Sequence, residues 1–237
     1  MSVRKGKPNK KLPIYQQISE YLHREIVSGR WLEGDRLPIE AELAVTLGVA
    51  VGTLRKALAQ LELDGLLERR QGSGTYVKRA PEGKAIYEFF HLELIEGGGV
   101  PTANTLSVNR REEKTLASAF PSGSVWTICR ERLLNRKLVA IEEINFNAAH
   151  ASSLTLEDLH ESLYLHYETH FNFWISKVED QIDCAIAPTW VCDALDVPDG
   201  SVLPRVQRWS WSNENHIEEF SHTWFDPTKA LYIALWR

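Results

Sequence analysis

The sequence predicts an α+β protein of two domains, and three observations support this prediction. Residues 12–78 combine apolar residues at helical spacing with a short strand–turn–strand pattern. A segment with proline, glycine and charged residues follows at 79–85 and is typical of a linker. Residues 86–237 contain long runs of alternating apolar and polar residues, which indicate an antiparallel sheet interspersed with helices. The 237 residues suffice for two ordinary domains.

The first domain is expected to contain three helices followed by a hairpin. The apolar residues of each helix recur on one face, and Gly29, Gly48 and Gly65 stand where the helices end. Residues 66–77 then have the pattern strand, glycine turn, strand. A short turn between the second and third helices completes the signature of a winged helix-turn-helix. The apolar faces consist of Ile14, Ile18, Leu22 and Ile26, then Leu43, Ala44 and Leu47, and finally Leu54, Leu58 and Leu61.

The charge is distributed unevenly along the chain. The net charge is −5, but residues 1–78 carry 13 Lys and Arg against 9 Asp and Glu, whereas residues 79–237 carry 14 against 23. A basic arm at 1–11 accounts for much of the positive end. An acidic protein with one basic end suggests that this end meets a polyanion such as nucleic acid. The alternative interpretation of the arm is a solvated tail.

Membrane and secreted classes do not fit this composition. No apolar run approaches the ~18 residues that span a bilayer, and the basic start lacks the apolar core of a signal peptide. The three cysteines include no Cys-x-x-Cys pair, which argues against a disulfide framework or a cysteine zinc site. We therefore expect a cytoplasmic protein with no membrane partner and no cofactor.

Nine short motifs follow one another along the first domain: Pro13–Ile18, Gly34–Pro38, Glu42–Ala44, Leu47–Val49, Thr53–Arg55, Ala57–Leu58, Leu61, Asp64–Leu66 and Arg70–Val77. Together they resemble the DNA-binding domain of GntR-type bacterial transcription regulators. The resemblance implies a recognition helix at about 51–63 in the major groove of double-stranded operator DNA, and a wing turn at 72–74 in the minor groove. The DNA-contacting residues that it implies are Arg36, Thr53, Arg55, Lys56, Arg70, Gln71, Gly72, Gly74 and Thr75.

The chain departs from the family pattern where DNA is usually read. Ala41 and Val51 stand where the family commonly has arginine, so Arg55 is the main base-reading candidate left in the helices. Ile39 and Ala50 replace serines suited to N-capping, and each missing cap costs about 1 kcal/mol. Each lost bidentate arginine removes about 1–3 kcal/mol of base discrimination. These changes, which extend to Gly52, point either to a different operator or to binding through phosphates, the wing and the basic arm.

The second domain is expected to contain two hairpins, one further strand and one helix. The residues at 135–137 and 213–215 are turn formers between alternating runs. Leucines at helical spacing predict a helix over Leu154–Tyr167, with Thr155 as its cap and Asp158 nearby. The expected strands are Ser124–Leu134, Val139–Phe146, Phe173–Ala187, Val202–Trp211 and Ile217–Phe225.

Five motifs of this domain are Arg130-x-Arg132, Glu142, Glu161–Tyr164, Val197–Val202 and Glu218–Ser221. Together they resemble the UTRA ligand-sensing domain of the HutC subfamily. The resemblance implies a chorismate-lyase-like fold that binds an effector and forms a homodimer. It also implies effector contacts from Arg130, Arg132, Glu142, Ser162, Glu219 and Phe225, the last standing where similar sensors often have tyrosine.

The arginine pair gives the effector its expected chemistry. Arg130 and Arg132 are two apart on a predicted strand, so both side chains leave from one face. Two guanidinium groups on one face suit a carboxylate or a phosphate. The alternative is a surface pair bridged to Glu142 or Glu143 across the hairpin. His166 and His170, four apart, are a weaker candidate for metal binding because no third ligand is in register.

The sequence is therefore interpreted as a ligand-responsive transcription regulator rather than an enzyme. We expect a homodimeric repressor released from its operator by a small anionic metabolite such as a phosphosugar, an organic acid or an amino-acid derivative. One alternative is a lyase-like enzyme fused to a DNA-binding anchor, although no catalytic set is evident. Another is a DNA-binding protein with a vestigial sensor domain.

Overall fold

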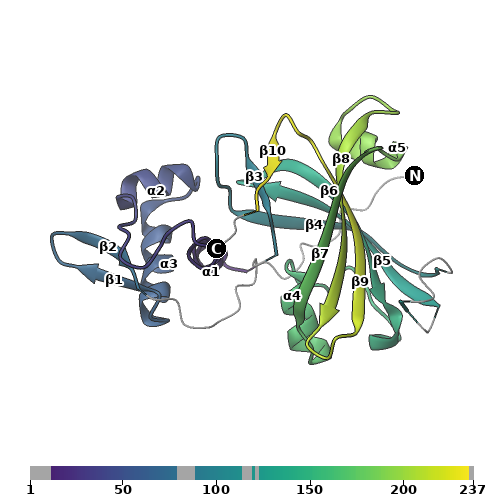
Figure 1. Ribbon diagram of the computed structural model, residues 1–237, viewed down its shortest axis with the longest axis horizontal. Helices are drawn as coiled ribbons and strands as arrows, with labels where there is room; N and C mark the ends of the chain where they lie inside the picture. The colour runs from purple at the N-terminus through teal and green to yellow at the C-terminus, as the bar shows by residue number, and fades with distance from the viewer. Residues whose placement is uncertain (1–11, 79–88, 114–118, 121–122, 235–237) are drawn as a thin grey trace. The chain divides into compact units, whose positions relative to one another are not determined.

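The chain forms two compact units, which we describe separately (Figure 1). One unit contains Leu12–Pro101 together with the described residues from Leu231 onward, and the other contains Thr102–Ala230. The basic arm 1–11 and the linker 79–85 lie outside the described residues. Within the described part, no helix has the length and apolar character needed to cross a membrane. The computed structural model describes residues 12–78, 89–113, 119–120 and 123–234.

The first unit contains the predicted winged helix-turn-helix, and α3 has the predicted bounds. Its core is formed by residues such as Ile18, Leu22, Leu54 and Leu58, which are almost completely inaccessible. Ile14 was expected on the same buried face but is 43% exposed, because it lies in the first turn of its helix. The elements are α1 (Ile14–Val27), α2 (Glu40–Thr46), α3 (Val51–Leu63), β1 (Leu67–Arg70) and β2 (Gly74–Val77).

The helix ends follow the expected capping chemistry. At the end of α1, Gly29 has a φ of +85° and its N–H donates to the carbonyl of Ile26. This left-handed conformation suits glycine. At their N-termini, α2 and α3 are preceded by Ile39 and Ala50, and neither of these N-cap side chains makes a capping hydrogen bond. The structure thus confirms that both helices lack side-chain N-caps.

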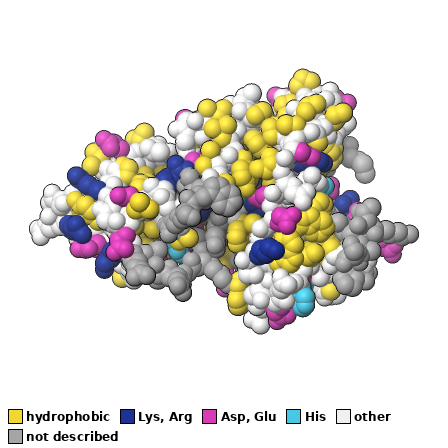
Figure 2. All heavy atoms as spheres, viewed as in Figure 1, with side chains coloured by type: hydrophobic (Ala, Val, Ile, Leu, Met, Phe, Trp, Pro, Cys, Tyr) yellow, Lys and Arg dark blue, Asp and Glu magenta, His cyan; other side chains and the backbone are white. Residues whose placement is uncertain are grey.

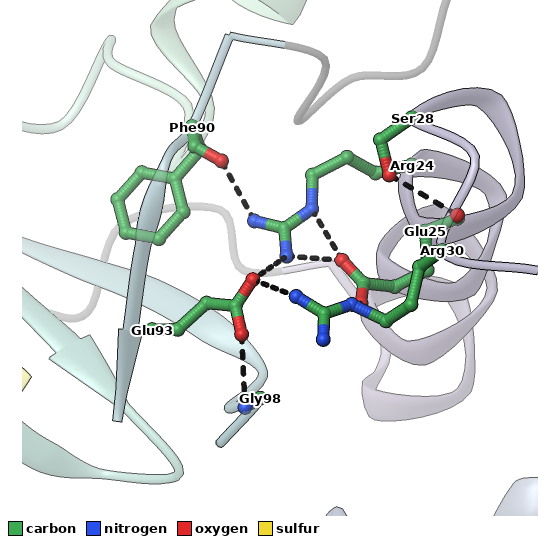
Figure 3. Close-up of polar contacts among 7 residues, drawn as sticks. All are labelled: Arg24, Glu25, Ser28, Arg30, Phe90, Glu93 and Gly98. Atoms are coloured by element: carbon green, nitrogen blue, oxygen red, sulfur yellow. Dashed lines mark hydrogen bonds and ion pairs between the residues drawn. The ribbon is translucent and has the colours of Figure 1, made fainter. Parts of the chain in front are cut away.

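A small sheet that was not predicted completes this unit. Strands β3 (Leu92–Leu94) and β10 (Ala230–Tyr232) pair with each other, and the Ile233 N–H donates to the carbonyl of His91 at 2.8 Å. Glu93 in β3 forms an ion pair with Arg30, just after α1 (Figure 3). Each strand spans three residues, too few to show a clear alternating pattern.

The second unit is built on a six-stranded sheet with the order β4-β5-β6-β9-β8-β7. Both predicted hairpins are confirmed, and Asn135 and Arg136 take positive φ values in the turn between β5 and β6. The pairs from β5 to β7 along this order are antiparallel. The strands are β4 (Pro101–Glu112), β5 (Ser124–Leu134), β6 (Lys137–Asn147), β7 (Ile175–Ile186), β8 (Val202–Ser212) and β9 (Ile217–Phe225).

The helix predicted over 154–167 is wrong. The structure has only a short α4 (Leu163–His166), followed by a single π-turn at Tyr167–Phe171. The Thr155 hydroxyl and N–H both donate to the Asp158 carboxylate at 2.8 Å, so these residues close a local turn and start no helix. Leu154 and Leu159 are buried without forming a helix, and Leu156 is half-buried.

Two elements of this unit escaped prediction. Helix α5 (Thr189–Leu195) packs on one face of the sheet, against Ile141 and Trp224. Strand β4 forms one edge of the sheet. Because alternate residues of a strand face opposite sides, the neighbours of Ile141 and Trp224 along β6 and β9 face the other side, where α4 lies.

Candidate nucleic-acid interface and ligand site

The predicted DNA-contacting residues of α3 lie on its outer side. Arg55 and Lys56 are exposed and Thr53 is half-buried, whereas Leu54 and Leu58 anchor the opposite side of the helix in the core. This arrangement follows from the helical period, since a buried stripe at every third or fourth residue leaves the intervening residues outside. Arg55 and Lys56 therefore lie at the surface of α3, with Thr53 partly exposed beside them.

A glutamate that sequence reasoning missed holds Arg55 in place. The Arg55 Nε donates to Oε2 of Glu40 at 2.6 Å, and Arg69 on β1 lies 3.9 Å from the same carboxylate. The side chain of Arg55 remains 64% exposed, so the guanidinium is accessible. An exposed pair of this kind contributes only about 0–1 kcal/mol to stability. Its effect is to orient the Arg55 guanidinium on the outer side of α3.

The wing brings the remaining predicted residues together. Gln71 and Gly72 lie exposed at its tip, and the Arg70 guanidinium lies 4.3 Å from the centre of the Tyr76 ring. Gly74 has a φ of +130°, and a Cβ atom there would lie 2.7 Å from the Nε of Arg36. A glycine thus lets Arg36 approach the base of the wing. Thr75 is half-buried beside it.

Acidic residues accompany these cations. Figure 2 shows Lys and Arg side chains interspersed with Asp and Glu over the winged-helix unit. Glu40, Glu62 and Glu68 each lie within 4 Å of an arginine of α3 or the wing. The described surface alone is therefore not a uniform basic patch, and specific arginines carry the positive charge toward a partner.

The second candidate site lies on the α4 side of the six-stranded sheet. The Arg130 Nη2 and Nε donate to Oε2 of Glu142 at 2.7 and 3.2 Å, and its Nη1 donates to the carbonyl of Glu161 at 3.1 Å. The Nε of Arg132 lies 3.5 Å from the other oxygen of Glu142. Both arginines are 6% exposed. The structure thus brings together the predicted arginine pair and Glu142.

The alternative of a surface pair applies only in part. The arginines do bridge to Glu142, but they are buried and lie beneath the segment that precedes α4. Glu143 faces the opposite side of the sheet and pairs with Arg111 at 3.3 Å. Burial raises the pKa of the Glu142 carboxyl, but the charges of Arg132 and Arg130 outweigh this effect and hold the pKa below its ordinary value.

Glu219 lies on the same face in a different electrostatic state. Phe146 of β6 pairs with Glu219 of β9, and Glu142 pairs with Thr223, which places these side chains on one face. The Tyr167 hydroxyl donates to Glu219 at 2.7 Å. Burial raises the pKa of the Glu219 carboxyl, although the bond from Tyr167 partly offsets this. The face therefore combines a carboxyl whose pKa is lowered with one whose pKa is raised.

The other predicted effector residues are nearby in the sheet or above it. Phe225, 5% exposed, pairs with Ala140 and shares the face of Glu142. Ser162 is the N-cap of α4, where its hydroxyl oxygen accepts from the Leu165 N–H at 3.4 Å. The prediction placed Ser162 inside a long helix. The capping position instead explains why this serine is buried at the start of α4.

Sequence reasoning missed two polar pairs on this face. The Arg208 side chain donates to both oxygens of Asp180, with Nε–Oδ1 and Nη2–Oδ2 distances of 2.6 Å each. The hydroxyl oxygens of Tyr164 and Ser210 lie 3.0 Å apart. Tyr164 stands inside a motif that carried the UTRA resemblance. The position of Arg208 and Asp180 depends on the strand order, which local patterns do not reveal.

No metal centre emerges in the described part of the chain. The rings of His166 and His170 are stacked, with their centroids 4.2 Å apart. The described residues contain no group of three or more His, Cys, Asp or Glu side chains arranged to hold a metal ion.

Comparisons with known proteins agree with both halves of this description. Residues 14–77 match the family described as bacterial regulatory proteins, gntR family, and residues 96–230 match the UTRA domain. The chain is 45% identical over 224 residues to the HTH-type transcriptional regulator SmoD of Agrobacterium fabrum, covering 94% of this chain and 96% of the relative. It is 32% identical to the Mannosyl-D-glycerate transport/metabolism system repressor MngR of Escherichia coli, with the same coverage of both chains.

Two solved structures share the fold. A ligand-binding domain of a GntR-family regulator from Bordetella bronchiseptica aligns with a TM-score of 0.58 at 22% identity, covering 64% of this chain and 99% of that one. The transcriptional regulator YydK of Bacillus subtilis aligns with a TM-score of 0.55 at 16% identity, covering 95% of this chain and 100% of that one.

Proposed function

Because the chain belongs to the GntR family of bacterial regulatory proteins and carries a UTRA domain, we propose that it is a homodimeric repressor released from its operator by an anionic metabolite. The family makes it a DNA-binding transcription regulator that responds to a ligand. Its relatives MngR of Escherichia coli and NagR of Bacillus subtilis are both named as repressors. Such a regulator acts in the cytoplasm, where the bacterial operator lies.

The observation that carries the proposal is the buried arginine pair. Arg130 and Arg132 lie on one sheet face and share Glu142 as a partner. A guanidinium fork suits planar or tetrahedral oxyanions, and charge-assisted hydrogen bonds of this kind are about twice as strong as neutral ones. An arriving carboxylate or phosphate would compete with Glu142 for these donors. Phosphosugars, organic acids and amino-acid derivatives all carry such a group.

On the DNA side, we propose that α3 enters the major groove and the wing contacts the minor groove. Arg55, Lys56 and Thr53 lie on the exposed side of α3, and Arg55 is the strongest candidate for a base contact. Arg36, Arg70 and the wing tip lie together at the hairpin. Their contribution would be to phosphates and the minor groove, which set affinity and register.

The mechanism is a shift between two populations of the dimer. In one, two winged helices match the half-site spacing of the operator, and in the other they do not. A ligand that favours the second arrangement releases the DNA. A coupling free energy of about 1–3 kcal/mol changes operator affinity by roughly 5–150-fold.

The test combines ligand binding with operator release. We would measure thermal shifts of the whole protein with phosphosugars, organic acids and amino-acid derivatives, and then titrate the binding compounds into the operator complex. Arg130→Ala and Arg132→Ala should each lose the ligand response while retaining operator binding, because each removes contacts worth about 1.5–3 kcal/mol. Arg136→Asn, in the exposed turn of the same hairpin, is the matched control. Normal release in both alanine variants would reject the anion site.

A further inference from the structure

The ion pair between Asp180 on β7 and Arg208 on β8 is more buried than an ordinary surface ion pair. It is bidentate, and the two side chains remain 11% and 16% exposed. This degree of exposure leaves the pair mostly desolvated, with a part of each side chain still in contact with solvent. The same two strands carry a second bidentate pair, Asp183 with Arg205, whose donor–acceptor distances are 2.9 and 2.5 Å.

The strand register separates these two pairs by face. Arg208 pairs with Ser221, which pairs with Ile144, two residues from Glu142 on the same face. Arg205 pairs with Trp224, which packs on the α5 side. The Asp180–Arg208 pair therefore shares its face with Arg130 and Glu142, whereas the Asp183–Arg205 pair lies on the other.

Arg208 is close enough to the anion site to act on it. The strands of Arg130 and Arg208 are three strand spacings apart, roughly 14 Å across the sheet, and Arg208 lies two residues farther along β8 than Val206, which the register places in line with Arg130. Both long side chains extend from this face. At Glu142 the charge of Arg208 adds to the larger effects of Arg132 and Arg130, which lower the pKa against burial. At Glu219 burial raises the pKa, and the charge of Arg208 offsets a small part of that rise. The two arginine sites are thus parts of one electrostatic environment.

Two hydroxyl groups belong to the part of this face around Arg208. Tyr164, from α4, and Ser210, on β8 beside Arg208 in the sequence, have their oxygens 3.0 Å apart. Arg208 also forms a side-chain hydrogen bond with Tyr164. This end offers a guanidinium, a carboxylate and two hydroxyls, which together can donate and accept several hydrogen bonds.

We propose that Asp180 and Arg208, together with Tyr164 and Ser210, determine effector specificity by binding the hydroxyl-bearing end of the anionic ligand. This inference rests on the proposed function, which places the anionic group at Arg130 and Arg132. A polyol end fits because each hydroxyl both donates, here to Asp180, and accepts, here from Arg208. A second anion would be repelled by Asp180. A hydrocarbon end would remove water from the pair without replacing its hydrogen bonds.

The experiment compares short and long anions on the intact protein. The probes are inorganic phosphate and glucose 6-phosphate as one series, and acetate and gluconate as the other. Dissociation constants are measured by calorimetry for the wild type, for the double variant Asp180→Asn/Arg208→Gln, and for the control Asp183→Asn/Arg205→Gln. Each double variant removes both charges of its pair at once, so neither leaves an unpaired charge behind. Asn matches the size of Asp, and Gln is a shorter, uncharged replacement for Arg that still forms hydrogen bonds.

In at least one series, the wild type should bind the long, hydroxylated anion about tenfold more tightly than the short one. The Asp180/Arg208 variant should lose most of this preference and keep its affinity for the short anion, and the control should behave as the wild type.

Three results would overturn the assignment. An unchanged preference in the Asp180/Arg208 variant, or an equal loss in the control, would show that the pair does not read the ligand. Loss of short and long anions alike would place the pair in the anion site itself. The proposed function fails differently: Arg130→Ala would then bind all four probes as the wild type does, or the wild type would bind none of them, and the specificity assignment would fall with it.

Discussion

Each unit contains a cluster of arginine–glutamate ion pairs, and the two clusters have different roles. In the winged-helix unit, Arg24 and Arg30 contact Glu25 and Glu93 in a group that we call the α1 clamp (Figure 3). In the sensor unit, Arg130 and Arg132 face Glu142. Both groups contain two guanidiniums, and in both the carboxylates are almost inaccessible to solvent.

The clusters differ in what holds their members in place. The α1 clamp joins a helix to a strand more than sixty residues away, and backbone groups complete it: Arg24 Nη1 donates to the Phe90 carbonyl at 2.7 Å, and the Gly98 N–H donates to Glu93 at 3.3 Å. The sensor arginines lie on β5, which backbone hydrogen bonds already align with β6. The clamp therefore positions a segment, whereas the backbone of the sheet positions the sensor cluster.

Breaking the clamp should have the largest effect on stability. Glu93→Gln removes the carboxylate that faces Arg30 and leaves buried positive charge uncompensated, so we expect a loss of about 3–5 kcal/mol. The expected loss lies toward the lower end, because Arg30 is partly exposed and keeps Glu25. Urea unfolding followed by circular dichroism measures it. Glu96→Gln, an exposed glutamate of the same segment, is the control. Equal midpoints in the two variants would contradict a structural role for the clamp.

The matched change in the sensor cluster should cost less stability. Arg130→Ala leaves Glu142 with Arg132, and the backbone pairing of β5 and β6 is unaffected. We expect a loss of about 1.5–3 kcal/mol in the same unfolding assay, with operator affinity unchanged. A loss larger than that of Glu93→Gln would mean that the sensor cluster, too, holds the fold together.

The exposed ion pair of Arg55 and Glu40 provides a third case, in which the pair contributes little to stability. Arg55→Ala should therefore leave the free energy of unfolding within about 1 kcal/mol of the wild type. It should weaken operator binding by about 1–3 kcal/mol and reduce discrimination against scrambled duplex. Competitive binding at fixed salt is the measurement. Equal losses on both duplexes would make Arg55 a phosphate contact.

The smallest expected effect is a pH dependence at Glu219. Its pKa is raised in the fold, mainly by burial, so the folded state binds a proton more tightly than the unfolded state does. Below the ordinary glutamate pKa of about 4.3 both states are protonated, and stability from this group declines as the pH rises through the raised pKa. Glu219→Gln removes this decline. The difference in Tm between variant and wild type should therefore increase from pH 4.5 to 8, and a constant difference would refute it.

Local patterns predicted elements well where one segment decides its own structure. The 3.6-residue period of Leu54, Leu58 and Leu61 defined α3, and the alternation around Asn135 defined the β5–β6 hairpin. The same method failed at 154–167, because Thr155 and Asp158 satisfy each other in a turn that competes with a helix. It also missed Glu93, whose partners come from a helix far away in the sequence.

The residues of the candidate ligand site also fall into two groups, those that the local sequence brings together and those that the strand order brings together. Arg130 and Arg132 are two apart on one strand, so the sequence by itself determined that they share a face, and the family motifs determined the class of regulator. Only the tertiary structure decided that β9 lies between β6 and β8, which carries Arg208 and, through β7, Asp180 onto that face. The reason is physical: periodicity is a property of one strand, whereas strand order depends on contacts between distant segments whose free energies appear only once the chain has folded.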